Sequence, residues 1–95
     1  MRGYELITII SPEIDEEGLS QTIDKLDKSI VERDGVVDEI NKWGRRKLAY
    51  PVKKFMEADY ILTRFKLEPK LVKEVEKDIK GWEEVLRYLV VQVED

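Results

Sequence analysis

The residues best suited to binding chemistry lie in one segment, 42–54, which contains six basic residues and no acidic one. The whole chain carries a formal charge of −4, so the residues outside this segment sum to −10. A positive segment in an acidic chain favours contact with an anionic partner. Tyr50 lies within the segment and can stack on an unpaired base, so the combination suits RNA. The alternative is an ordinary solvated basic loop. The six cations are Lys42, Arg45, Arg46, Lys47, Lys53 and Lys54.

Catalytic chemistry has little support in the composition. The chain contains neither histidine nor cysteine, so the commonest general base, the commonest metal ligand and the thiolate nucleophile are all missing. Its five glycines form no phosphate-binding loop. Carboxylates are abundant, but they fall mainly on the solvent faces of two predicted helices. We therefore expect no enzyme, no metal site, no cofactor and no small-molecule substrate.

Chain length and hydrophobic patterning also limit the cellular locations that we expect for the protein. No apolar run approaches the ~20 residues that a membrane-spanning helix needs, and the first residues lack the pattern of a secretory signal. The absence of cysteine fits a reducing compartment. A chain of 95 residues is long enough for one domain and too short for two. We expect a single cytoplasmic domain over 1–95 that makes no contact with a membrane.

Hydrophobic periodicity predicts six elements in the order β-α-β-β-α-β. Asp15 is placed to cap the first helix, and Gly35 supplies a left-handed stop after it. Pro69 suits the first position of the second helix, which Gly81 ends. The elements are a strand over 4–10, a helix over 16–33, a strand over 36–50, a loop over 53–58, a strand over 59–67, a helix from 69 and a strand over 84–93.

The second strand carries two signs of irregularity. Its alternation breaks between Val37 and Ile40, which predicts a β-bulge there or at Gly44. Pro51 cannot donate to a β-ladder, so it places this strand at a sheet edge or marks its end.

This order folds most simply as an α+β, ferredoxin-like domain, in which a four-stranded antiparallel sheet carries both helices on one face. The opposite face would then expose apolar side chains, and such a patch usually marks an interaction site. The alternative is that the long second strand folds over part of it. The residues expected on this open face are Ile7, Ile9, Tyr60, Leu62, Leu89 and Val91.

Further arginines fall on predicted strands and would extend a cationic surface, namely Arg2, Arg64 and Arg87. An RNA-recognition motif has the same element order, so it is a competing interpretation. However, the aromatic residues that it needs at the centre of the first strand and the basic-glycine-aromatic run of the third are missing. The predicted open face is aliphatic rather than aromatic, which argues against that motif.

Three segments together resemble the family of bacterial ribosomal small-subunit protein six. They are the opening Met-Arg-x-Tyr-Glu, the run Gly-Arg-Arg-Lys-Leu-Ala-Tyr-Pro-Val over 44–52, and the run Val-Leu-Arg-Tyr-Leu-Val-Val over 85–91. The resemblance extends from Arg2 to about Val93, and the Gly-x-Arg-x-Leu-Ala-Tyr-Pro pattern is fairly specific. It implies the ferredoxin-like fold that the periodicity predicts independently.

The resemblance also implies a function. Proteins of that family are structural components of the small ribosomal subunit that support its assembly and translation. They bind the central domain of small-subunit ribosomal RNA as a heterodimer with small-subunit protein eighteen. Lys47 stands where the family commonly has arginine or another polar residue, and a lysine there would replace a bidentate phosphate contact by a point charge. Many relatives carry a tail that helps to hold the protein partner, whereas this chain stops at Asp95, so we expect the apolar open face to supply more of the protein interface. Basic positions shared with the family are Arg2, Arg45, Arg46 and Arg87.

A different class of function stays open on the residues alone. A non-ribosomal interaction or regulatory module of this fold could self-associate through its open sheet face. That interpretation explains the apolar patch but leaves the six cations of segment 42–54 without a role.

Overall fold

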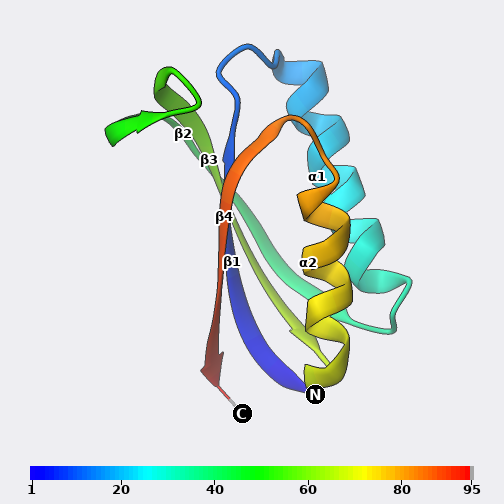
Figure 1. Ribbon diagram of the computed structural model, residues 1–95. Coiled ribbons are helices and arrows are strands. Elements are labelled where there is room, and N and C mark those ends of the chain that lie inside the picture. Colours follow the sequence, from blue (N-terminus) through cyan, green and yellow to red (C-terminus); the bar gives the residue numbers. More distant parts are fainter. Residues whose placement is uncertain (95) are drawn as a thin grey trace.

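The structure is a computed structural model, and it describes residues 1–94. A four-stranded antiparallel sheet in the order β2-β3-β1-β4 carries both helices on one face, which confirms the predicted ferredoxin-like fold (Figure 1). No helix within residues 1–94 has the length and apolar content needed to cross a membrane. Asp95 lies outside the described residues, and so does the expectation drawn from the chain stopping there. The elements are β1 (Arg2–Ile10), α1 (Glu16–Val31), β2 (Val36–Val52), β3 (Phe55–Leu67), the 3-10 turn η1 (Pro69–Leu71), α2 (Val72–Lys80) and β4 (Val85–Glu94).

Strand β1 is central, as its two apolar faces predict. Alternate residues of β1 point into the helix-covered layer and are buried, whereas Ile7 and Ile9 face the other side and are half-buried. The Tyr4 ring stacks on Phe65 of β3, with centroids 5.5 Å apart. Together with the apolar stripes of both helices, these side chains form one core.

Helix α1 begins where the sequence predicts, but the left-handed residue after it is not the predicted one. Asp15 caps it, because its carboxylate accepts a hydrogen bond of 2.8 Å from the backbone N–H of Gly18. After the helix, Asp34 adopts the left-handed conformation with φ of 64°, so the expected left-handed role of Gly35 is wrong. Gly35 is needed for space instead: a Cβ there would lie 2.8 Å from the carbonyl oxygen of Lys66 and 2.9 Å from that of Ile30.

The connection between β2 and β3 is much shorter than the predicted loop over 53–58. Strand β3 begins at Phe55, and only Lys53 and Lys54 form the turn. Both have positive φ, 49° and 75°, which is the backbone of a two-residue hairpin turn with the right twist for its strands. The sequence hides this turn, because asparagine and glycine rather than lysine usually occupy such positions.

The irregularities of β2 occur where the sequence predicts them. The register with β3 shifts between Val37 and Glu39 and again between Lys42 and Gly44, and Gly44 has φ of 86°. A third shift lies between Lys47 and Val52. The predicted edge position is confirmed, since β2 pairs only with β3.

Glu84, just before β4, ties the α2–β4 loop to α1. Its carboxylate lies 2.6 Å from Nζ of Lys25 and accepts a hydrogen bond of 2.7 Å from the hydroxyl of Thr22. Burial by itself raises the pKa of Glu84, but the hydrogen bonds from Lys25 and Thr22 outweigh burial and leave the pKa below its usual value. The ionised carboxylate is therefore stabilised in the folded state.

We expect Gly35→Ala to lower the free energy of unfolding by about 1–3 kcal/mol, because the new methyl group would push against two backbone carbonyls. Gly81→Ala is the matched control, since the nearest atom to its Cβ would be 3.4 Å away. That control should stay within about 0.5 kcal/mol of the unmodified protein. Urea denaturation measures both, and equal midpoints for the two variants would contradict the assigned role of Gly35.

We expect Glu84→Gln to lower the free energy of unfolding by about 1 kcal/mol at pH 7, and by progressively less as the pH falls. A carboxyl group with a lowered folded-state pKa stabilises the protein above its unfolded pKa, roughly 4.3, and loses that contribution as pH falls through its folded pKa. Denaturation curves between pH 7 and pH 3 measure the difference. Glu83→Gln is the control because Glu83 is exposed and forms no ion pair within residues 1–94. A difference independent of pH would contradict the assignment.

Candidate nucleic-acid interface

The six cations of segment 42–54 are all exposed and lie on the outer half of β2 and its turn. Strand β1 ends at Ile10, opposite Asp59, so β2 and β3 continue beyond their neighbour. We call this unsupported part, residues 46–58, the hairpin overhang. It bends toward the side of the sheet opposite the helices (Figure 1). Most of the overhang therefore lies away from the helix layer.

Arg45 stands at the base of the hairpin overhang and is held by an ion pair. Its Nε and Nη2 atoms donate to the two carboxylate oxygens of Asp59 at 3.3 and 3.2 Å, and Nη2 also donates to the carbonyl oxygen of Pro12 at 3.1 Å. The Asp59 side chain is only 12% exposed. Its hydrogen bond raises the pKa of the Arg45 guanidinium. Arg45 thus joins β2 to β3 and to the loop after β1, and this contact fixes the start of the overhang.

Two more cations have partners, but weaker ones. Lys42 lies 3.3 Å from a carboxylate oxygen of Glu16, and both side chains are well exposed, so solvent screens the pair. The guanidinium of Arg46 lies over the ring of Trp43 at 5.1 Å, and Trp43 in turn stacks on Tyr60 at 6.3 Å. A cation over an aromatic face is attracted by the ring but keeps its full charge. Arg46 is therefore oriented without being neutralised.

Lys47, Lys53 and Lys54 are the remaining cations of the segment. Within residues 1–94, no carboxylate or hydrogen-bond acceptor holds their side chains. All three lie in the hairpin overhang, and two of them form its turn. These three ammonium groups are the ones most available to an anion.

Tyr50 and Arg87 meet across the sheet. Nη1 of Arg87 on β4 donates to the Tyr50 hydroxyl at 2.6 Å, and its guanidinium lies 5.5 Å from the ring centre. A hollow of about 140 Å³ lies between the end of β2 and the sheet, with Ile9 and Tyr60 in its lining. The long second strand therefore does fold over part of the open face. One side of the Tyr50 ring contacts Arg87, so only its other side is left for a further stacking contact.

Arg2 lies far from the other predicted RNA contacts. It pairs with Leu67 at one end of the β1–β3 ladder, whereas Asp59, which binds Arg45, pairs with Ile10 at the other end. Eight residue steps along a strand span roughly 25 Å. The structure thus separates Arg2 from the hairpin overhang, whereas it brings Arg87 to it.

The apolar part of the open face is smaller than the sequence suggests. Leu89 is 56% and Val91 is 44% exposed, so the exposed apolar surface concentrates on the edge strand β4. Leu62 is only 5% exposed and offers almost no surface to a partner. The other three residues predicted for this face, Ile7, Ile9 and Tyr60, are half-buried.

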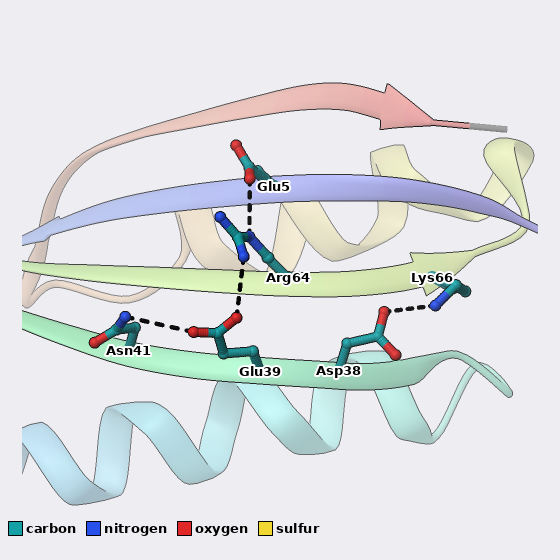
Figure 2. A network of polar contacts seen from close by, with 6 residues as sticks. All are labelled: Glu5, Asp38, Glu39, Asn41, Arg64 and Lys66. Carbon is teal, nitrogen blue, oxygen red and sulfur yellow. Dashed lines mark hydrogen bonds and ion pairs between the residues drawn. The ribbon is translucent and has the colours of Figure 1, made fainter.

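A charged network that the sequence analysis missed crosses three strands of the same face (Figure 2). Arg64 on β3 donates to Glu5 on β1 at 2.9 Å and to Glu39 on β2 at 3.1 Å. The hydrogen bond to Glu5 raises the pKa of Arg64. Beside it, Lys66 donates to Asp38 at 2.8 Å. Arg64 is therefore held by carboxylates rather than extending a cationic surface. The strand register is the signal that would have found it, since Arg64 lies opposite both glutamates.

The chain is similar in sequence to known proteins. A sequence model of the family described as Ribosomal protein S6 matches residues 3–92. The chain is 40% identical over 95 residues to the small ribosomal subunit protein bS6 of Heliobacterium modesticaldum, covering 100% of this chain and 99% of that protein. It is 42% identical to the bS6 of Clostridium novyi, covering 99% of each.

The fold of the chain is also similar to that of solved structures. The crystal structure of 30S ribosomal protein S6 from Thermotoga maritima superposes with a TM-score of 0.92 at 32% identity, covering 97% of this chain and 87% of that one. The C-terminal domain of the MgtC protein from Mycobacterium tuberculosis has a TM-score of 0.61 at 11% identity, with 99% of this chain and 89% of that one covered. This second likeness shows the fold alone.

We expect Arg45→Gln to lower stability and Lys47→Gln to leave it unchanged, although both remove one positive charge from the same strand. The first change leaves the largely buried Asp59 carboxylate without its cation, whereas Lys47 has no such partner within residues 1–94. Urea denaturation at one pH and salt concentration measures both. Equal stabilities would show that the Arg45–Asp59 pair does not hold the hairpin.

Proposed function

This chain belongs to the ribosomal protein S6 family, and on that premise we propose that it binds the central domain of small-subunit ribosomal RNA together with small-subunit protein eighteen. The family consists of structural ribosomal proteins rather than enzymes, and its place is the small ribosomal subunit. Membership sets aside the alternative of a non-ribosomal module. The RNA contacts and the protein partner are the proposed part.

The observation that carries the RNA proposal is the division among the cations. Arg45 is held within the fold by Asp59. Lys47, Lys53 and Lys54 lie on the hairpin overhang and form no ion pair within residues 1–94, and the acidic residue across the ladder from Lys47 is Glu57. An acidic chain that keeps three such charges on one projection is suited to a polyanion. Lysines that neutralise phosphates release counterions and so favour binding.

The arrangement suits recognition of RNA shape more than RNA sequence. Point charges on a projecting turn contact phosphates and set the position of the protein, but they carry no base information. Arg46, oriented over Trp43, adds planar N–H donors beside the three lysines. The overhang would lie along the backbone at an irregular part of the RNA, with the free side of Tyr50 available to an unpaired base.

The protein partner is proposed to contact the open face. Leu89 and Val91 expose the apolar surface there, on an edge strand that pairs with β1 alone within residues 1–94. The network around Arg64 borders this surface and supplies polar groups of both signs. A small apolar centre beside a polar rim is the usual composition of a protein interface.

We expect the triple change Lys47→Gln, Lys53→Gln and Lys54→Gln to weaken RNA binding strongly. Loss of three phosphate contacts should reduce the slope of log affinity against log salt by about 2–3. The probe is a fragment of the central domain of small-subunit ribosomal RNA, titrated at several salt concentrations with small-subunit protein eighteen present. The fold should survive, because none of the three side chains has a partner in residues 1–94.

The matched control changes Lys28, Lys70 and Lys73 to glutamine, which removes the same charge from exposed positions on the helical side. If both triple variants bind alike, net charge rather than the hairpin overhang governs affinity and the proposed site is wrong. Equal affinity with and without small-subunit protein eighteen would contradict joint binding.

A further inference from the structure

A hollow of about 270 Å³ lies where the β2–β3 turn, the end of α2 and the start of β4 come together. Three cations from these three elements line it: Lys53 from the turn, Lys80 from the last residue of α2, and Arg87 from β4. No acidic residue is among the lining residues within 1–94. Figure 1 shows these three segments at the same end of the molecule.

The rest of the lining is apolar or aromatic. Ile79, Val85 and Leu86 are buried beneath the hollow and offer almost no surface, whereas Tyr88 beside them is half-buried. The Tyr88 hydroxyl donates to Glu76 at 3.0 Å, which fixes the ring. A cationic rim beside an aromatic ring provides for the two chemically different halves of a nucleotide, a phosphate and a flat base.

The three charges are placed in ways that keep them available. Arg87 is oriented by its hydrogen bond to Tyr50, which accepts only one of its N–H groups. Lys53 and Lys80 have no carboxylate partner within residues 1–94. The carbonyl end of α2 by itself disfavours an anion, and Lys80 at that end offsets this effect. Three like charges around one hollow repel each other until an anion enters.

We infer that this hollow receives one nucleotide of an unpaired RNA segment, with its phosphate among Lys53, Lys80 and Arg87 and its base against the ring of Tyr88. The inference rests on the proposed RNA binding and adds a defined subsite and Lys80 to it. RNA is favoured over a free nucleotide because Lys53 belongs both to this hollow and to the hairpin overhang, so one strand can follow the overhang into the hollow.

The first test compares Lys80→Gln with Lys73→Gln. Both remove an exposed charge from α2, but Lys73 is not in the lining of the hollow. Loss of one phosphate contact should weaken binding of the central-domain RNA roughly three- to tenfold and reduce the salt slope by about 1 for Lys80→Gln only. If both variants bind like the unmodified protein, the subsite is wrong while the proposed function stands. If the unmodified protein binds no RNA, the proposed function fails and the subsite with it.

The second test addresses the hollow directly in the full chain. Adenosine 5′-monophosphate should shift the backbone amide signals of residues 85–88 in NMR spectra, and Lys80→Gln should reduce these shifts whereas Lys73→Gln should not. Inorganic phosphate should give smaller shifts than the nucleotide, because it has no base to contact the ring of Tyr88. Equal shifts from phosphate and nucleotide, or shifts spread over all exposed lysines, would overturn the nucleotide subsite. Matching urea midpoints for the two variants would exclude a folding defect as the cause.

Discussion

Two helices cover only one face of a four-stranded sheet, and this constraint shapes the rest of the molecule. The covered face holds the core, including Leu6 and Phe65. The other face must meet water or a partner, and it is divided among three arrangements. A charged network around Arg64 occupies one part, the end of the β2–β3 hairpin folds over Ile9 and Tyr60, and Leu89 and Val91 stay exposed. The apolar area left open is therefore modest and lies on β4.

The hairpin owes its shape to unequal strand lengths. Strand β2 has 17 residues and β3 has 13, whereas β1 has only 9, so the outer hairpin has no neighbouring strand to support it. Side-chain contacts replace that support, above all the Arg45–Asp59 ion pair, the Trp43–Tyr60 stack and the Tyr50–Arg87 contact. Basic residues thus serve two purposes within a few positions of each other. Some basic residues hold the strand in position, and their neighbours carry charges that are available to an anion.

The fold was predictable because its signals are local. Strand alternation, the Asp15 cap, the apolar stripe of α1 and the bulge-forming breaks in β2 all act within a few residues. The turn at Lys53–Lys54 was missed because the strands on either side impose its backbone against the preference of its residues. The division of the cations was also beyond the sequence. It depends on which carboxylate lies across the ladder, as with Arg45 and Asp59, and on a three-dimensional hollow that brings Lys80 to Arg87.

The lysine turn also bears on how this protein balances folding against binding. A left-handed backbone costs an ordinary residue roughly 1–2 kcal/mol, and both Lys53 and Lys54 adopt it. Asparagine and glycine would relieve that strain but would remove two charges from the most projecting part of the molecule. The chain keeps a turn that is suboptimal for the stability of the isolated protein. A redesign of these two positions for thermal stability would remove both charges from the proposed RNA interface.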